Sequence, residues 1–426
     1  MSASTLAGSG ESAPAPAPRN GSQGVRAALG DYLARLRGGD VGGLPAVLGL
    51  VVLIIVFAAL RPDTFTNAFN FANLINQGAA VIVIAMGLVF VLLIGEIDLS
   101  AGYTAGTAGA VMSLMLQKHT SLNWWEGLLI CLVTGAVIGT VLGLLVARLG
   151  IPSFVVTLAA FLGLQGVMLK LIGEGGTIPL RDPTLLRVMN NNLPVWLGWT
   201  LMVVVAAVYA LVSLRRVLTR RAGGLDNQGI TVWALKVAAV TLMLALPTYY
   251  LSIERSRNPQ VTSIKGVPWV VPVLVILLGG LTFLLSRTPF GRHVYAVGGN
   301  AEAARRAGIN VSLVRLICFI ACSTLASVAG VLLASRDNSI SPSTGGSSTL
   351  LYAVGAAVIG GTSLFGGKGR VADAVLGGLV VAIIANGMGL LNQTSAVVYI
   401  VTGLVLLIAA SVDAISRRRA AATGRI

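Results

Sequence analysis

Residues 128–147 read LLICLVTGAVIGTVLGLLVA, twenty consecutive positions without a charged side chain. A helix of about 20 mostly apolar residues is long enough to cross the hydrocarbon core of a bilayer. Runs of this kind recur along the 426 residues, of which 55% are hydrophobic and only 11% are charged. Soluble domains carry roughly 25% charged residues, so the composition excludes a soluble globular protein. The sequence predicts an all-α, polytopic membrane protein.

The apolar runs follow one another closely enough to predict about twelve membrane-spanning helices. The run at 350–364 is the weakest, because it is short and rich in Ala and Gly. The predicted spans are 44–60, 79–94, 101–116, 128–147, 154–171, 195–214, 230–251, 269–285, 313–334, 350–364, 371–391 and 397–415.

The basic residues predict how the chain is oriented. The 30 Lys and Arg residues exceed the 15 Asp and Glu residues, which gives a net charge of +15. In a soluble protein this excess would indicate nucleic-acid binding, whereas in a membrane protein basic residues concentrate on cytoplasmic loops. With the N-terminus inside, twenty basic residues fall on the inner side and nine on the outer side, while Lys236 lies within a span. We therefore expect both termini to be cytoplasmic and no nucleic-acid partner.

The two ends of the chain differ from the region that holds the spans. Residues 1–43 are rich in Pro, Ala, Gly and Ser and predict a disordered cytoplasmic tail, with a short amphipathic helix at 25–36. The transmembrane domain is expected at 44–415, and a basic cytoplasmic tail at 416–426.

A polar break interrupts the apolar runs at 95–102, which reads GEIDLSAG. A charged side chain within a bilayer usually faces a cavity or a partner, so Glu96 and Asp98 could line the path of a solute beside Ser100 and Gly102. Two other interpretations are a metal-carboxylate pair and a cytoplasmic turn whose Asp98 or Ser100 caps the next helix. The metal site is the weakest of the three, because no His or further carboxylates stand near enough in the sequence to complete it.

A second polar segment, GGNAEAARRAG at 298–308, has the signals of a complete short helix. Asn300 suits the N-cap, Glu302 the first turn, Arg305 and Arg306 the last turn, and Gly308 the left-handed position after the helix. A helix of two turns is marginal in water. It is either a fraying turn in a solvated loop or a helix that docks on a cytoplasmic partner.

Residues 360–369, GGTSLFGGKG, superficially look like a phosphate-binding loop. That motif requires Gly where Thr362 stands and Ser or Thr where Gly369 stands, and its flanks are a strand and a helix rather than two spans. We therefore expect no nucleotide site and no cofactor. Asn386, within a predicted span, could hydrogen-bond to another helix or to a solute.

Four signatures in the right order resemble the permease subunits of ABC importers, in their ribose and xylose branch. Glu302-Ala303-Ala304 followed by Gly308 resembles the EAA-type loop that docks on the ATPase. The other three signatures are Asn70, Asn73 and Gln77 followed by the break at 95–102, GIPSFVVTL at 150–158, and VIGGTSLFGGKG at 358–369. Residues 215–266 look like an insertion typical of the longer, xylose-type members. At 350–352 this chain has Leu-Leu-Tyr where the ribose type carries acidic residues.

The resemblance implies a non-enzymatic permease subunit that transports a monosaccharide, xylose or a similar pentose, across a bacterial plasma (inner) membrane by alternating access. It implies a homodimer that binds two cytoplasmic ABC ATPase subunits and an extracytoplasmic sugar-binding protein. The coupling loop would be 287–311, and the residues expected to contact or position the ATPase are Asn300, Glu302, Ala303, Ala304, Arg305, Arg306 and Gly308. The residues expected on the path or at its hinges are Glu96, Asp98, Ser100, Gly102 and Asn386.

Two other classes compete with this interpretation. An ion-coupled secondary sugar transporter also commonly has twelve spans, and it would need carboxylates in mid-membrane, for which only Glu96 and Asp98 qualify. A membrane-embedded transferase would need a clustered, Asp-rich metal site, which the sequence does not contain.

Overall fold

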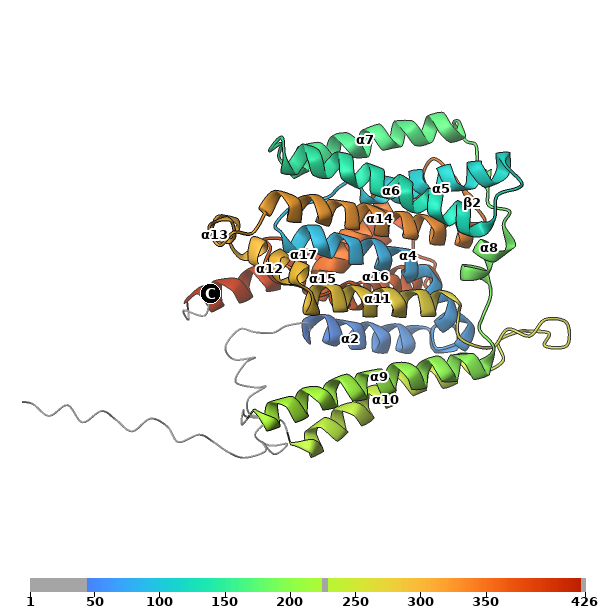
Figure 1. Ribbon diagram of the computed structural model, residues 1–426. Helices are drawn as coiled ribbons and strands as arrows, with labels where there is room; N and C mark the ends of the chain where they lie inside the picture. Colours follow the sequence, from blue (N-terminus) through green and yellow to red (C-terminus); the bar gives the residue numbers. More distant parts are fainter. Residues whose placement is uncertain (1–43, 224–228, 423–426) are drawn as a thin grey trace, which may run out of the picture. The chain divides into compact units, whose positions relative to one another are not determined.

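The computed structural model describes residues 44–223 and 229–422. The predicted disordered tail and the amphipathic helix at 25–36 lie outside the described residues. Within them the chain is almost entirely helical (Figure 1). The last helix extends beyond the predicted span at 397–415 and includes residues 416–422 of the predicted basic tail.

The elements follow one another in this order. The first half has α2 (Leu44–Leu60), α3 (Pro62–Phe65), α4 (Ala68–Leu93), α5 (Ala101–Lys118), α6 (Trp124–Ala147), α7 (Ser153–Ile172), β1 (Ile178–Pro179), α8 (Pro183–Asn190) and α9 (Val195–Ala222). The second half has α10 (Ile230–Ser252), α11 (Val270–Arg287), α12 (Pro289–Gly299), α13 (Ala301–Arg306), α14 (Val311–Asp337), β2 (Ser339–Ile340), α15 (Ser347–Gly360), α16 (Val371–Leu390) and α17 (Ser395–Ala422). The two short strands pair antiparallel, with Ile178 opposite Ile340.

Each of the twelve predicted spans overlaps one helix of the described chain. Eight of the described helices are long and apolar enough to cross a membrane, namely α4, α6, α7, α9, α10, α11, α14 and α16. The helices α2 and α15 and the Ser395–Ile408 part of α17 are apolar but shorter. The number of spans therefore stays a prediction.

Several helices begin or end at other residues than the predicted spans, and two of these differences have a local cause. The span expected at 79–94 begins eleven residues earlier, at Ala68, because polar side chains that interrupt the apolar run are themselves within the helix. The span expected at 350–364 ends at Gly360, where Gly361 has a positive φ of 117° and closes the helix.

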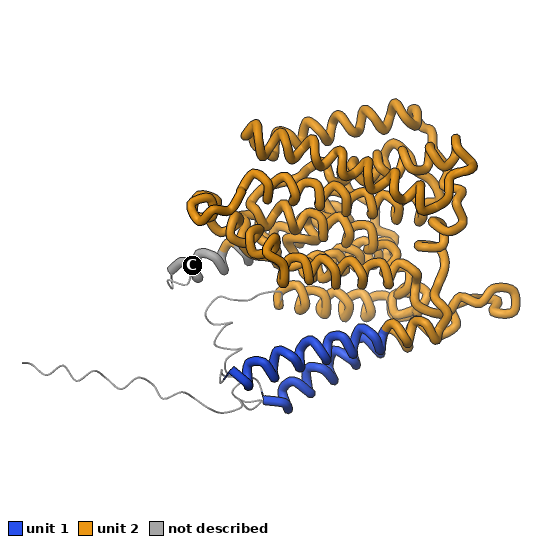
Figure 2. Tube along the Cα trace, viewed as in Figure 1, with its two compact units in different colours: residues 1–37, 202–246 blue, residues 38–201, 247–426 orange. Residues whose placement is uncertain are grey.

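The chain divides into two compact units (Figure 2). One contains Met202–Leu246, which comprises most of α9 and α10. The other contains the described residues of Gly38–Leu201 and Pro247–Ile426, and it holds both candidate sites described below. In this larger unit α14 packs against α4, α5 and α6, and α4 is buried almost continuously from Gly78 to Leu93.

Glycines bring the backbones of α6 and α14 into direct contact. A Cβ atom at Gly139 would lie 2.7 Å from the Phe319 carbonyl oxygen, and one at Gly135 would lie 2.6 Å from the Ser323 carbonyl oxygen. Gly143 approaches Leu316 in the same way one turn further along. In a bilayer, small residues at four-residue spacing allow this close helix packing, which takes the place of a layer of large side chains.

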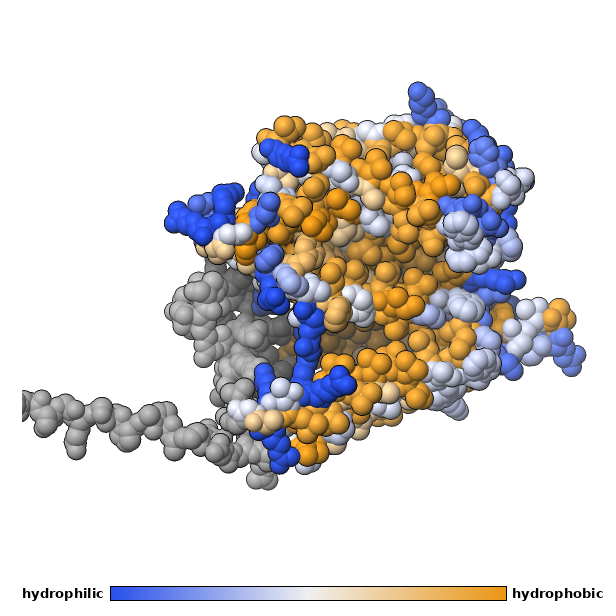
Figure 3. Space-filling model, viewed as in Figure 1, coloured by the Kyte–Doolittle hydropathy of each residue, from blue (hydrophilic) through white to orange (hydrophobic). Residues whose placement is uncertain are grey.

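Hydrophobic side chains cover the flanks of the helices, and hydrophilic ones gather near the helix ends, on the face that Figure 3 shows. The helices α7 and α11 are hardly buried within the chain. Only 17% of the most apolar 18-residue stretch of α7, and 11% of that of α11, is buried. A helix that exposes so many apolar side chains requires lipid or another protein around it.

Candidate functional site

The predicted short helix is present as α13, and both of its ends have the predicted caps. The Asn300 side chain accepts a hydrogen bond from the Ala303 amide at 2.9 Å. Gly308 has a φ of +83°, and its amide donates to the Arg305 carbonyl at 3.0 Å. Any residue other than Gly at position 308 would have to adopt a left-handed backbone that L-residues avoid. The capping pattern in the sequence was therefore sufficient to predict the local structure.

Charged side chains of α13 face outward, while one of its alanines fixes it to the protein. Glu302 forms ion pairs with Arg305 at 2.7 Å and with Arg306 at 3.2 Å, and the three side chains are between 56% and 79% exposed. Ala303 is exposed, whereas Ala304 is buried in the hydrophobic core. Exposed pairs of this kind contribute only about 0.3–0.5 kcal/mol, so the charges are available to a partner at little expense to the helix.

Behind α13, three backbone segments meet without intervening side chains, in what we call the glycine junction: Leu93 at the end of α4, Gly298 at the end of α12, and Gly367 in the loop before α16. The Gly367 amide donates to the Leu93 carbonyl at 2.8 Å. A Cβ atom at Gly298 would lie 1.8 Å from that same carbonyl oxygen. The Tyr295 hydroxyl donates to the Gly369 carbonyl at 2.8 Å, which joins α12 to the same loop.

The polar break after α4 is joined to α14 by an ion pair. Glu96 Oε1 lies 3.1 Å from Arg315 Nε, with the Glu96 side chain 15% exposed and that of Arg315 30% exposed. Asp98 and Ser100 are both buried, and Asp98 Oδ1 accepts hydrogen bonds from the Ser100 amide at 2.8 Å and from the Ser100 hydroxyl at 2.6 Å. Asp98 therefore organises the turn that precedes α5, and Glu96 connects this turn to the helix that follows α13.

Gly102, predicted on the path or at a hinge, lies in a close packing contact. A Cβ atom there would be 2.2 Å from the Gly345 carbonyl oxygen. Any side chain at position 102 would collide with this backbone, so packing alone explains the glycine.

Asn386 belongs to a cluster of buried amides at the opposite end of α4. Its Nδ2 donates to Asn70 Oδ1 at 2.9 Å, and Asn70 Nδ2 donates back to Asn386 Oδ1 at 2.9 Å. Asn386 Nδ2 also lies 3.3 Å from Gln77 Oε1. Asn70 and Leu93 are 23 residues apart on one continuous helix, so the amide cluster and the glycine junction are separated by roughly 35 Å.

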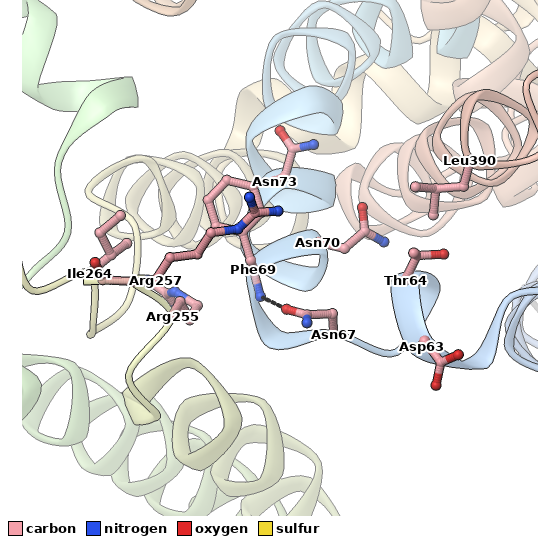
Figure 4. A pocket seen from close by; sticks show the side chains of 11 residues that line it. Asp63, Thr64, Asn67, Phe69, Asn70, Asn73, Arg255, Arg257, Ile264 and Leu390 are labelled. Carbon is pink, nitrogen blue, oxygen red and sulfur yellow. Dashed lines mark hydrogen bonds between the residues drawn. The ribbon is translucent and has the colours of Figure 1, made fainter. Parts of the chain in front are cut away.

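A cavity of about 620 Å³ opens beside the amide cluster (Figure 4). Its lining comes from α3, the first turns of α4, the end of α16 and the loop that follows α10. The lining residues are Asp63, Thr64, Asn67, Phe69, Asn70, Asn73, Arg255, Ser256, Arg257, Ile264 and Leu390. Amide, hydroxyl and guanidinium groups beside an aromatic ring can donate to and accept from the hydroxyl groups of a small polar solute.

The loop between α10 and α11 is held in one shape on the edge of this cavity. Arg255 is 8% exposed and donates to the Leu251 carbonyl at 2.8 Å and to the Gly266 carbonyl at 2.9 Å. Glu254 accepts hydrogen bonds from the Ser263 hydroxyl and from the Ile264 amide, and these lower the pKa of Glu254 to about 2. The loop is therefore preorganised by its own charged residues.

The structure brings the predicted residues together in two groups rather than one. Asn300, Glu302, Arg305, Arg306 and Gly308 lie on α13 close to Glu96, whereas Asn386 lies at the far end. Reasoning from the sequence did not single out several site residues, among them Arg315, Asn70 and the cavity residue Arg255. Arg315, the partner of Glu96, occupies an amphipathic first turn that looks like any helix start, and Asn70 gave a signal only as part of a family signature. Among the described residues, no group of three His, Cys, Asp or Glu side chains is placed to hold a metal ion.

Comparison with known proteins gives a consistent set of relatives. Residues 70–410 match the family described as branched-chain amino acid transport system / permease component. The chain is 34% identical to the xylose transport system permease protein XylH of Escherichia coli (strain K12), over 88% of this chain and 92% of that protein. It is 31% identical to the protein of the same name in Haemophilus influenzae, over 88% and 96%. It is 30% identical to the ribose import permease protein RbsC of Escherichia coli (strain K12), over 86% and 92%. No solved structure matches the chain significantly.

Proposed function

Because the chain belongs to the branched-chain amino acid transport system / permease component family, and within it to the ribose and xylose branch, we propose that it is the permease subunit of an ABC importer for a monosaccharide, xylose or a similar pentose. Its place is the plasma (inner) membrane of a bacterium. The observation that carries the proposal is the capped helix α13, which exposes Glu302, Arg305 and Arg306 at the end of the protein opposite the amide-lined cavity.

The distribution of basic residues supports an orientation in which both termini and α13 are cytoplasmic. In this orientation two copies of the chain form a homodimer, and each α13 docks on one of two ABC ATPase subunits. The cavity at Asn70 and Arg255 then opens toward the outside, where a sugar-binding protein delivers its solute. The chain carries out no covalent chemistry, because ATP hydrolysis belongs to the partner subunits.

The contacts around α13 provide two routes from the ATPase to α4. One route runs through α12 and the glycine junction, where Gly298 touches Leu93. The other runs through the start of α14, where Arg315 pairs with Glu96. The first route ends at Leu93, the last residue of α4, and the second ends at Glu96, just after it. The other end of α4 carries Asn70 and borders the cavity. ATP-driven movement of α13 would thus open and close the two ends of the pathway in alternation.

Transport in proteoliposomes tests this proposal. The chain is reconstituted with its ABC ATPase and its sugar-binding protein, and radiolabelled xylose uptake is measured with and without internal ATP. We expect uptake to require ATP and all three components, and to persist in the presence of a protonophore and a sodium ionophore. Uptake by the chain alone that collapses with these ionophores would overturn the proposal in favour of an ion-coupled secondary transporter.

Two substitutions test the docking role of α13. Glu302→Lys breaks both ion pairs and reverses the exposed charge, while Gly308→Pro is incompatible with the φ of +83°. Both variants should lose ATPase co-purification and uptake while still inserting into the membrane. Arg148→Glu is the matched control, because it reverses an exposed charge at the end of α6, outside α13. Normal uptake by both α13 variants would refute the docking assignment.

A further inference from the structure

The α9–α10 unit, Met202–Leu246, has a cavity of its own whose lining the transport function does not use. The cavity measures about 320 Å³ and lies between the two helices near their connection. Its polar lining consists of Tyr209, Ser213, Arg216, Arg220, Trp233 and Lys236. Three cationic groups therefore converge on one small space.

Helix geometry places these cations at matching depth. Arg216 lies six residues before the end of α9 at Ala222, and Lys236 lies six residues after the start of α10 at Ile230. At 1.5 Å per residue, the backbone of each of these two residues lies about 9 Å along the helix from its end at the α9–α10 connection. The Trp233 indole nitrogen donates to the Ser213 hydroxyl at 3.0 Å and joins the two helices beside the cavity. Tryptophan is enriched at this level, where the hydrocarbon of a bilayer meets its headgroups.

The charge balance of the unit favours an anionic ligand. The sequence of 202–246 has five basic residues and a single acidic one, Asp226, which lies outside the described residues. Arg216 and Arg220 lie one helical turn apart and both line the cavity, so their like charges repel one another, and an anion between them removes this repulsion.

The surroundings of the cavity favour a ligand with apolar tails. Exposed aliphatic side chains flank the cavity on both helices, including Leu211, Val212, Leu218 and Leu235. Figure 3 shows hydrophilic residues gathered at this end of α9 and α10 beside hydrophobic flanks. A soluble anion would use the cations alone, whereas a phospholipid would use both surfaces.

We propose that this cavity binds the phosphate headgroup of an anionic phospholipid, with its acyl chains along the apolar flanks of α9 and α10. Basic pockets between spanning helices on the cytoplasmic side recognise anionic headgroups in this way. The cytoplasmic placement rests on the orientation given under the proposed function. The binding itself requires neither the sugar nor the ATPase. The unit thereby anchors the insertion at 215–266 to the anionic lipids of one leaflet.

The test uses the purified full-length chain in a zwitterionic detergent and native mass spectrometry with three probes: phosphatidylglycerol, phosphatidylcholine and inorganic phosphate. The cavity variant is Arg216→Gln/Arg220→Gln. Its matched control, Arg215→Gln/Arg221→Gln, removes the same number of charges from the same helix at positions outside the lining. All four side chains are exposed, so neither pair should disturb folding.

We expect the wild type and the control to bind phosphatidylglycerol, and the cavity variant to bind it about tenfold more weakly than the control. Phosphatidylcholine should bind weakly to all of them. Equal losses in the two double variants would overturn the proposal, because they would indicate diffuse surface charge. Displacement of the lipid by millimolar inorganic phosphate would overturn it in favour of a soluble-anion site.

A second measurement does not depend on the double variants. Phosphatidylglycerol should change the Trp233 fluorescence, isolated as the difference between the wild type and Trp233→Phe, and phosphatidylcholine should not. An unchanged difference spectrum would overturn the proposal. Because neither measurement includes transport, failure of the lipid site leaves the proposed importer function standing, and failure of ATP-driven uptake leaves the lipid site standing.

Discussion

Replacement of Gly298 by Ala is the most direct way to disturb the glycine junction. The added Cβ would lie 1.8 Å from the Leu93 carbonyl oxygen and 2.7 Å from the Gly367 amide nitrogen, whereas Cβ atoms normally stay at least 3.0 Å from such atoms. Both neighbours are backbone atoms and cannot rotate away. The end of α12 must therefore move away from the end of α4 by about 1 Å or more.

The size of the effect follows from this overlap. Overpacking of a tightly packed contact costs about 1–3 kcal/mol, and a change of that size alters an equilibrium between two conformations about 5- to 150-fold. The exposed charges of α13 are unchanged by the substitution, so the ATPase should still bind. We expect the protein to hydrolyse ATP in complex with its partners while uptake per ATP hydrolysed falls about tenfold or more.

The neighbouring residue provides the matched control. A Cβ at Gly299 would have no atom within 4 Å, and Gly299→Ala changes the same helix end by the same group. The general gain in helix propensity from Gly to Ala is common to both variants and cancels in the comparison. The assay is radiolabelled sugar uptake and phosphate release in the same proteoliposomes, with thermal unfolding of each variant as a check of folding. Equal uptake per ATP in the two variants would refute the role of the junction in coupling.

Three further predictions concern the other polar contacts. Asn386→Ala removes both side-chain hydrogen bonds to Asn70 and should lower the free energy of unfolding in detergent by about 1–3 kcal/mol. The double variant Asn70→Leu/Asn386→Leu should lose less unfolding free energy than the sum of the losses of its two single variants. Additive losses would contradict the pairing. Glu96→Arg and Arg315→Glu should each reduce uptake by up to about fivefold, and the double exchange should restore it, because the ion pair is partly exposed; no recovery would argue against this contact. Glu254 has a pKa of about 2 in the folded protein against a usual 4.5, so its ionised form stabilises the loop fully above pH 4.5 and loses this effect as the pH falls toward 2. The thermal unfolding temperatures of the wild type and Glu254→Gln should differ by a constant amount at higher pH and should converge as the pH falls. A difference that widens on acidification would contradict the stabilising role of ionised Glu254.

Local signals in the sequence were sufficient for most helices and for α13. Apolar length predicted where the long helices lie, and the Asn300 and Gly308 caps predicted a six-residue helix that has no apolar periodicity. These signals depend on residues close together in the chain, so a single sequence carries them.

Tertiary partners could not be predicted in the same way. Asn70 looks like a polar residue before a span, and its pairing with Asn386, 316 residues away, shows how its amide is satisfied within α4. The sequence left three interpretations of the Glu96 carboxylate open, because its partner, Arg315, is distant in the sequence. The helix α5 shows the converse: its Gly, Ala, Ser and Thr residues lower its hydropathy, yet they allow the close approach at Gly102.

The backbone contact between α6 and α14 has a consequence for how the membrane acts on transport. Helices that touch through Gly135, Gly139 and Gly143 cannot slide past each other without separating, so they move as one body. Under the proposed function, an ATPase that displaced α13, which is joined to α14 by the short segment 307–310, would displace α6 with it. The opposite face of α6 exposes an apolar row of Leu129, Val133, Val137 and Val141. Each such displacement would move lipid along this row, and the thickness and order of the bilayer would then add to the resistance that ATP hydrolysis has to overcome.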